Sequence, residues 1–395
     1  MTLFSMNKRY LDGILYKAES GISLSHREIV NLLTLEDTES IQKVMKSARK
    51  LREQHFGNKL FLYGFIYFST YCKNHCTFCF YRKTNSLSPR YRKNLSEVVD
   101  IAARLADSGV HLIDLTMGED PDIYRTGGFD VLLEMIDRVK VTTGLPVMIS
   151  PGVIPDDILE KMSDSGVTWY ALYQETHNQL LYRKLRVGQG FAARKNKRLK
   201  ARELGMLVED GMLLGVGETT GDRADSILCM KHEGVHQARV MSLVPQRQTP
   251  MAGRVAIPRI NEYLCIAVMR LLMPDRLIPA SLDVDGIKGL EMRLEAGANV
   301  VTSIIPSSSS LAGVSQSTLD IEQGLRAVPE VKKILAGKGL EAAGLGEYSA
   351  WIASQKGKIS SGVGEYDENP NSRRTASGAG GSISCPAGWT GSSAN

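Results

Sequence analysis

No apolar stretch in this 395-residue chain approaches the roughly 20 residues that are needed to span a bilayer. The N-terminus, MTLFSMNKRYLDG, turns polar too early for a secretory signal peptide. An excess of one charge is also lacking, because the net charge is +5 and the Lys and Arg residues are scattered rather than clustered. We therefore expect a cytoplasmic protein that has neither a membrane nor a nucleic acid as its partner.

Cysteine is scarce, and half of it lies in one short segment. Of the 6 cysteines, Cys72, Cys76 and Cys79 fall within YFSTYCKNHCTFCFYRK. In a reducing compartment, clustered cysteines indicate metal chemistry rather than disulfides. Cys229 and Cys265 stand alone in segments that are predicted to be helical, and we interpret them as small buried residues.

Helix and strand patterns alternate along most of the chain. Residues 1–56 show helical spacing that ends at Gly57, and from residue 60 onward short apolar runs alternate with amphipathic segments. The predicted strands are 60–68, 111–117, 146–150, 168–173, 206–214, 238–244, 277–283 and 299–305. Such alternation predicts a parallel sheet. Eight strands in series fit an α/β fold of the (β/α)8 barrel type best, with a six-stranded partial barrel or a doubly wound sheet as alternatives.

We expect three parts in the chain: an N-terminal helical segment over 1–56, the barrel over 57–340, and a tail over 355–395. The tail is rich in Gly and Ser and lacks periodicity, so we expect it to be disordered and exclude its Cys385 from any site. A barrel forms its sites at the C-terminal ends of its strands. The three-cysteine loop directly follows the first strand, which places it at that mouth.

Three thiolates are one ligand too few for a closed tetrahedral metal site. Thiolates suit iron–sulfur clusters or zinc. A cluster that is held by three cysteines leaves one iron without a protein ligand, and that iron can chelate a small molecule. A zinc ion would recruit His75 or a distant residue as its fourth ligand. The position of the triplet after the first barrel strand favours the cluster.

The spacing Cys72-x3-Cys76-x2-Cys79, with Phe78 just before the third cysteine, resembles the signature of radical S-adenosylmethionine (SAM) enzymes. The resemblance implies a [4Fe–4S] cluster whose open iron is chelated by the amino and carboxylate groups of SAM. It also implies that an electron from the reduced cluster cleaves a carbon–sulfur bond of SAM and yields a 5′-deoxyadenosyl radical.

Further segments resemble the biotin-synthase-like branch of this superfamily. The segments TMGED, YQET and GFAAR imply SAM contacts by Glu119, Glu175 and Arg194, with Ser150 at the end of the third strand as a further candidate. GVGET (215–219) resembles a Gly-rich turn that packs near the nucleoside. The residue types alone leave alternatives open, because either glutamate could stabilise a helix N-terminus and Arg194 could be a solvated helix residue.

Charged side chains recur inside the predicted strands. Asp114, Arg239 and Asp283 each share a strand face with apolar residues, and Ser281 lies on the same face as Asp283. Charges in parallel strands are costly unless they are paired or bind a ligand. Two carboxylates and one guanidinium sum to −1, which would balance a diamino acid: Arg can clamp its carboxylate and each Asp can accept from an amine. Alternatively, Arg239 forms an ion pair with one of the aspartates without a ligand.

Longer segments, among them FIYFSTYCKNHCTFC, DLTMGEDP and RLIPASLD, resemble the methylornithine synthases, the radical SAM lysine mutases that open pyrrolysine biosynthesis. The likeness runs from about residue 5 to about residue 335. It implies that Arg239 meets the carboxylate of the ligand, and that Asp114, Asp283 and Ser281 meet its amines. The implied reaction converts L-lysine to (3R)-3-methyl-D-ornithine, with a reductant such as ferredoxin or flavodoxin as the partner.

Two other functions remain open at this point. Another biotin-synthase-like enzyme, such as the radical SAM maturase of [FeFe]-hydrogenase, would share the cluster and the SAM contacts without needing a diamino-acid pocket. A non-catalytic protein that is stabilised by zinc would share only the cysteines. Sulfur insertion is disfavoured, because the sequence offers no second cysteine set for an auxiliary cluster.

Overall fold

The structure, a computed structural model, describes residues 8–315, 321 and 323–361. Three helices precede the sheet: α1 (Lys8–Glu19), α2 (His26–Leu33) and α3 (Thr38–Phe56). The Asp37 side chain accepts a hydrogen bond from the Ser40 N–H and so begins α3. Gly57, with φ of 60°, ends α3 and turns the chain into the first strand.

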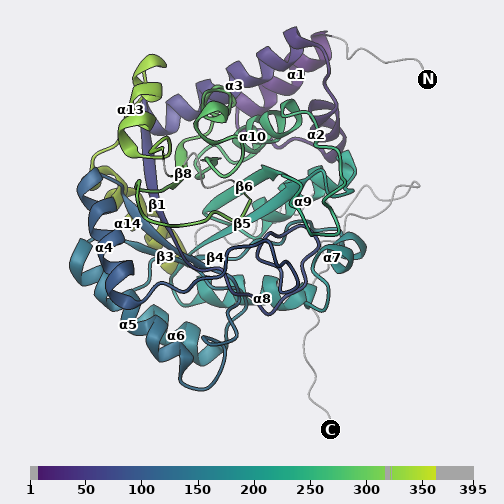
Figure 1. Cartoon of the computed structure of the whole chain (residues 1–395). Coiled ribbons are helices and arrows are strands. Elements are labelled where there is room, and N and C mark those ends of the chain that lie inside the picture. Colours follow the sequence, from purple (N-terminus) through teal and green to yellow (C-terminus); the bar gives the residue numbers. More distant parts are fainter. Residues whose placement is uncertain (1–7, 316–320, 322, 362–395) are drawn as a thin grey trace.

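The strands form one parallel sheet that curls into a barrel (Figure 1). They are β1 (Lys59–Ser69), β2 (Leu112–Met117), β3 (Val147–Ser150), β4 (Trp169–Ala171), β5 (Leu207–Leu214), β6 (Gln237–Ser242), β7 (Pro279–Ser281), β8 (Val300–Ile304) and the short β9 (Glu341–Ala342). Their order is β6-β5-β4-β3-β2-β1-β8-β7, and β9 pairs with β1. An isolated bridge between Gln237 and Leu277 joins β6 to the chain just before β7. The predicted (β/α)8 fold is therefore confirmed, and its closure contradicts the open, doubly wound alternative.

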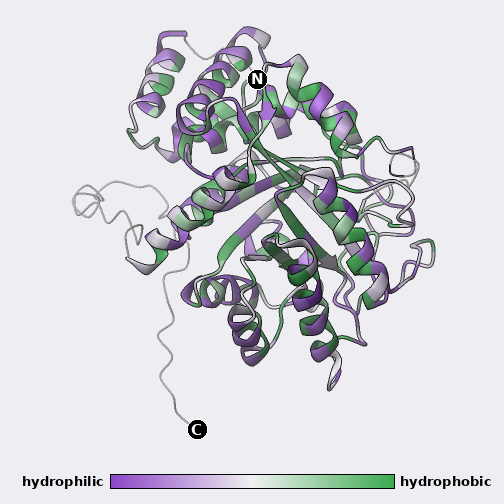
Figure 2. Ribbon diagram, turned by 90° about the vertical axis from the view of Figure 1, so that its left-hand side faces the viewer, coloured by the Kyte–Doolittle hydropathy of each residue, from purple (hydrophilic) through white to green (hydrophobic). Residues whose placement is uncertain are grey.

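Helices cover the outside of the barrel (Figure 1). They are α4 (Leu95–Ser108), α5 (Gly128–Thr143), α6 (Asp156–Asp164), α7 (Gln179–Leu185), α8 (Phe191–Glu203), α9 (Thr220–His232), α10 (Ile260–Leu272), the 3₁₀ helix η1 (Gly286–Gly289), α11 (Leu290–Glu295), α13 (Val328–Gly337) and α14 (Leu345–Ser360). Figure 2 shows polar residues on the outer faces of several of these helices and apolar residues along the central strands. None of the helices in the described ranges is long and apolar enough to cross a membrane.

An aromatic cluster closes the N-terminal end of the barrel, which we call the floor. Trp351 of α14 stacks on Trp169 at the start of β4, with ring centroids 5.9 Å apart. Tyr348 accepts a hydrogen bond from Trp169 Nε1 (3.1 Å) and donates one to the Tyr63 hydroxyl of β1 (2.8 Å). Tyr63, Trp169 and Tyr348 are fully buried, so the floor leaves no opening at these rings.

Two elements lie past residue 340, where the barrel was predicted to end. β9 pairs with β1 through Lys59–Glu341 and Leu60–Ala342, and α14 contributes Tyr348 and Trp351 to the floor. α14 runs to Ser360, so it includes the first residues of the range that was assigned to the tail. Residues 362–395, with Cys385, lie outside the described residues.

Candidate active site

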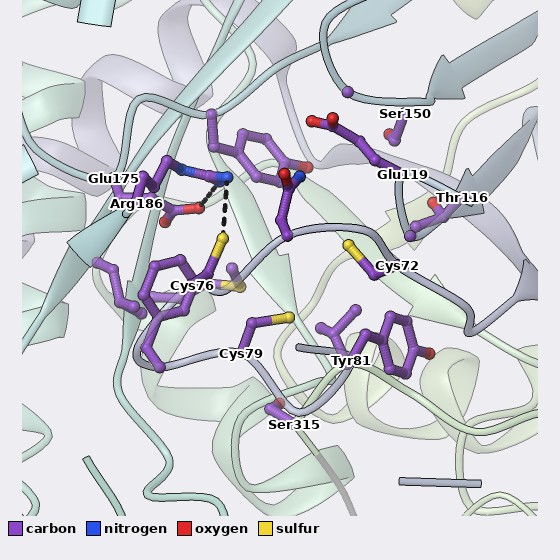
Figure 3. A pocket seen from close by; sticks show the side chains of 18 of the residues that line it. Cys72, Cys76, Cys79, Tyr81, Thr116, Glu119, Ser150, Glu175, Arg186 and Ser315 are labelled. Carbon is purple, nitrogen blue, oxygen red and sulfur yellow. Dashed lines mark hydrogen bonds and ion pairs between the residues drawn. The ribbon is translucent and has the colours of Figure 1, made fainter. Parts of the chain in front are cut away.

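A cavity lies at the C-terminal end of the barrel, with a volume of about 1080 Å³ that includes open solvent at its mouth. It is lined by the three predicted cysteines and by residues at or just beyond the ends of β2 to β6. Phe78, Glu119, Ser150, Glu175 and Arg194 all line it. The structure therefore brings the three cysteines and these five residues into one cavity, part of which Figure 3 shows, whereas the Gly-rich turn at 215–219 does not line it.

The cysteine loop that follows β1 is held in place by backbone contacts. Lys73 N donates to the carbonyl of Glu119 (2.9 Å), and Thr77 N donates to the carbonyl of Leu185 (2.9 Å). At Gly118 any Cβ would overlap the carbonyl oxygen of Tyr71, so only glycine permits this close approach of the two loops. The loop is thus fixed from both sides of the cavity.

The three sulfur atoms face a common space (Figure 3) but are not packed as a zinc site would require. A single zinc ion with Zn–S bonds of about 2.3 Å would bring its sulfur ligands to within roughly 4 Å of one another. Among the described residues, the cysteines do not form a set whose ligand atoms all lie within 4.8 Å. His75, the proposed fourth zinc ligand, does not line the cavity. The wider spacing and the all-thiol ligand set fit a multi-iron cluster.

The surroundings of Cys72 and Cys79 disfavour the free thiolate. Burial raises the pKa of Cys72 to about 11, and burial together with the neighbouring cysteines raises the pKa of Cys79 still further. A bound metal centre supplies the positive charge that deprotonates such thiols. The site therefore suits a cationic cluster better than three unliganded cysteines.

Glu119 projects into the cavity from the loop after β2. Its Oε2 lies 3.4 Å from Lys73 Nζ, which in turn lies 3.6 Å from the centre of the Tyr124 ring. At Gly152 a Cβ would overlap the side chain of Glu119, so glycine makes room for this carboxylate. Glu119 is well before Gly128, where α5 begins, and the alternative role at a helix N-terminus is therefore wrong.

Glu175 lies in the loop after β4 with a left-handed backbone, φ 67°. Its N–H donates to the carbonyl of Gly211 (2.9 Å) and its carbonyl accepts from Leu213 N (2.9 Å), which holds this uncommon conformation. Its carboxylate forms an ion pair with Arg186, a residue that sequence reasoning missed. Glu175 precedes α7 by several residues and faces the cavity, so it does not act at a helix terminus.

Arg194 lies in the first turn of α8 and is 4% exposed, so the alternative of a solvated helix residue is wrong. Its Nε donates to the carbonyl of Tyr173 (2.8 Å), and its Nη1 lies 3.9 Å from Glu119 Oε1. Phe78, which also lines the cavity, packs in an apolar cluster with Leu185 and Leu243, among others. The Gly-rich turn at 215–219 is held by its own Glu218, which accepts from three successive backbone N–H groups.

The four predicted ligand contacts of the barrel interior form a deeper layer, which we call the lower layer. Each lies shortly before a residue that lines the cavity. Asp114 precedes Thr116 in β2, and Arg239 precedes Met241 in β6. Ser281 and Asp283 precede Val284, which follows β7. All four are buried and none lines the cavity itself. Because the strands run toward the cavity, Asp114 and Arg239 lie below its lining in β2 and β6, and Ser281 and Asp283 are buried at and just after the end of β7.

Arg239 forms its ion pair with Glu209 and not with Asp114 or Asp283, the pairs that the sequence left open. Its Nε donates to Glu209 of β5 (2.6 Å) and its Nη1 to the Thr302 hydroxyl (3.0 Å). Its Nη2 is buried and has no hydrogen-bond partner within the described residues. Glu209 was missed, although an acidic residue in the apolar segment MLVEDGMLL carries the same signal as Asp114.

Asp283 is also embedded in contacts that the sequence did not reveal. It accepts from the Tyr67 hydroxyl (2.6 Å) and the Ser303 hydroxyl (2.8 Å) and pairs with Arg326 (2.9 Å). Ser281 Oγ lies 3.4 Å from Ser303 Oγ and accepts from the Asp283 backbone N–H (3.3 Å).

Asp114 is the least compensated charge in the lower layer. Its Oδ1 accepts from Thr116 Oγ1 (2.8 Å) and from Ser150 Oγ (3.2 Å), whereas its Oδ2 is buried without a hydrogen-bond partner among the described residues. Burial, assisted by the charge of Glu209, raises the pKa of Asp114 to about 7. Among the described residues, Asp114, Asp283 and Glu209 supply three carboxylates and Arg239 and Arg326 two guanidinium groups, a formal net charge of −1.

Comparison with known proteins agrees with this geometry. The sequence pattern of the radical SAM superfamily matches residues 66–229. The chain is 45% identical over 338 residues to 3-methylornithine synthase from Methanosarcina acetivorans (86% of this chain, 96% of the relative). It is 42% identical over 334 residues to 3-methylornithine synthase from Methanosarcina barkeri (85% and 95%). It is 31% identical over 279 residues to the [FeFe] hydrogenase maturase subunit HydE from Thermotoga maritima (70% and 79%).

Among solved structures, the crystal structure of methylornithine synthase (PylB) superposes with a TM-score of 0.82 at 42% sequence identity, covering 86% of this chain and 99% of that one. The [FeFe]-hydrogenase maturase HydG from Carboxydothermus hydrogenoformans superposes with a TM-score of 0.73 at 23% identity, covering 84% of this chain and 79% of that one. The latter likeness concerns the fold alone.

Proposed function

Because the chain belongs to the 3-methylornithine synthase family of the radical SAM superfamily, we propose that it converts L-lysine to (3R)-3-methyl-D-ornithine. The observation that carries the proposal is a pair of buried, unpartnered atoms in the lower layer of the described barrel, Asp114 Oδ2 and Arg239 Nη2. One is an acceptor suited to an ammonium group, and the other is a donor suited to a carboxylate. Buried polar atoms of this kind need a partner, and a diamino acid supplies both.

The three cysteines would hold a [4Fe–4S] cluster, with Glu119, Ser150, Glu175 and Arg194 around SAM. When they are bound, the reduced cluster and SAM supply a 5′-deoxyadenosyl radical. Phe78 anchors the cysteine loop in its apolar cluster. The buried guanidinium of Arg194, which faces the cavity, suits the carboxylate of SAM, and the carboxylate of Glu119 suits its amino group.

The lower layer would position the amino acid directly beneath SAM. Arg239, which Glu209 and Thr302 orient, would donate to the carboxylate, while Asp114 and Asp283 would accept from the two ammonium groups. Ser281 would add a hydroxyl beside Asp283. The work of these residues is to hold one conformer of the substrate and to exclude water, since radicals must be kept from side reactions.

A second candidate function, that of an [FeFe]-hydrogenase maturase, has support in the 31% identity to HydE. The lower layer favours the lysine mutase, because its residues match a ligand with two positive groups and one negative group. A low-potential one-electron donor such as ferredoxin or flavodoxin would complete the reaction. We place the reaction in the cytoplasm, where the cysteines stay reduced.

The test is anaerobic incubation of the reconstituted, reduced protein with SAM and L-lysine, followed by mass spectrometry for methylornithine. We expect Asp283→Asn to lower turnover at least about 100-fold while SAM binding persists, because it removes a charged acceptor for an ammonium group. The matched control is Asp285→Asn, two residues along, where the side chain is exposed and pairs with Arg259. Normal turnover in Asp283→Asn would refute the assignment of the lower layer, and an unaltered protein that leaves lysine unchanged would refute the proposed function.

A further inference from the structure

The sulfur of Cys76 has two side-chain hydrogen-bond donors from the segment that ends α7. Gln189 Nε2 lies 3.0 Å from Cys76 Sγ, and Arg186 Nη1 lies 3.8 Å from it. Figure 3 shows the Arg186 contact beside the ion pair of Arg186 with Glu175. The hydrogen bonds found among the described residues include no side-chain donor to the sulfur of Cys72 or Cys79. Cys76 therefore has a more polar environment than the other two ligands.

The orientation of the Gln189 amide follows from its other contacts. Its Oε1 faces two guanidinium donors, Arg186 Nη1 at 3.3 Å and Arg194 Nη1 at 3.4 Å. A guanidinium has only donors, so the carbonyl oxygen of the amide must face these groups. The NH₂ group is consequently directed at the sulfur, which makes the contact with Cys76 a true donor–acceptor pair.

The donors are held in place by the fold. Arg186 is 8% exposed and its guanidinium is paired with Glu175. Leu185, its neighbour in sequence, accepts a hydrogen bond from Thr77 N in the cysteine loop (2.9 Å). The end of α7 and the cysteine loop are thus connected through the backbone, which places both donors beside Cys76.

We propose that Arg186 and Gln189 are positioning residues that set the reduction potential of the iron–sulfur cluster through the sulfur of Cys76. The inference rests on the cluster assigned in the proposed function. The reduced cluster carries one more negative charge than the oxidised cluster, so N–H donors and a buried cation near a ligand sulfur stabilise the reduced state more. Uptake of the single electron from the reductant then becomes easier, with no bond made or broken in the protein.

The experiment is a potentiometric titration with dithionite, followed by electron paramagnetic resonance, of the full chain after anaerobic cluster reconstitution. The key variant is Gln189→Glu, because it keeps an oxygen for the two guanidinium groups but loses the N–H donor to Cys76. Arg186→Met removes the cationic donor. The matched control is Arg183→Met, which removes the same charge from an exposed position of α7.

We expect Gln189→Glu and Arg186→Met each to make reduction of the cluster about tenfold less favourable, a fall of about 59 mV in midpoint potential for one electron. Arg183→Met should keep the potential of the unaltered protein. If Arg186→Met fails to hold a cluster, the midpoint potentials of Gln189→Glu and of the neutral Gln189→Leu test the inference. Unchanged potentials in variants with a full complement of about four iron and four sulfide ions would overturn this inference alone. An unaltered chain without such a cluster would overturn the proposed function as well.

Discussion

The raised pKa of Asp114 predicts that lowering the pH stabilises the fold but weakens ligand binding. Its pKa is about 7, against an ordinary value of 3.8, because the carboxyl is buried and lies near Glu209. The difference corresponds to about 4 kcal/mol, at 1.36 kcal/mol for each pH unit. A carboxyl whose pKa is higher in the folded than in the unfolded state binds its proton more tightly in the fold, so its ionisation destabilises the empty protein as the pH rises from about 4 to about 7.

Binding of a diamino acid should show the reverse dependence. The ammonium group needs the ionised form of Asp114, and the side-chain amine of lysine stays charged throughout this range because its pKa is about 10.4. The affinity should therefore be level above pH 7 and fall about tenfold for each pH unit below it, which makes it about 100-fold weaker at pH 5.

Titration calorimetry with L-lysine and SAM measures this dependence in the full chain with its cluster oxidised, so that no turnover occurs. Thermal unfolding without lysine supplies the second measurement. Asp114→Asn should abolish the pH dependence of binding, and its stability advantage over the unaltered protein at pH 8 should shrink as the pH falls. An affinity that is constant from pH 6 to pH 8, or a slope that persists in Asp114→Asn, would contradict the reasoning.

Two glycine substitutions test cluster binding and SAM binding independently of each other. Gly118→Ala should sharply lower the iron content after reconstitution, because its Cβ would overlap the carbonyl of Tyr71 in the cysteine loop; Gly253→Ala, which meets nothing within 4 Å, is the control. Gly152→Ala should leave the iron content intact but weaken SAM binding at least about tenfold, since its Cβ would displace Glu119. Equilibrium dialysis with labelled SAM checks the second effect, and unaltered affinity would show that Glu119 does not need its observed position.

Much of the barrel is predictable because its strands are short apolar runs that glycine-terminated helices separate. The eight predicted segments correspond to β1 to β8, with differences at the ends. The segment 168–173 forms a strand only over Trp169–Ala171, because the chain then leaves the sheet toward Glu175, whose left-handed backbone no propensity indicates. β9 has two residues and depends on pairing with β1, so no local pattern reveals it.

The site was predictable where a local motif or a buried charge reveals it. The cysteine loop has both spacing and context, and Asp114 and Arg239 are charges in apolar runs. Arg186 was not predictable, because the segment LYRKLRVG contains several cations and only the packing against the cysteine loop decides which of them is buried. Glu209 could have been found by the reasoning that found Asp114.

The aromatic floor has a consequence for the sequence of events in a catalytic cycle. Trp169, Tyr348 and Trp351 close the N-terminal end of the described barrel, whereas the cavity lies at its C-terminal end, so we expect both small molecules to enter from the cavity side. In the proposed assignment, the amino acid binds below the residues that surround SAM. If the proposed assignment holds, we expect lysine to bind before SAM, SAM to cover it during the rearrangement, and the products to leave in the opposite order.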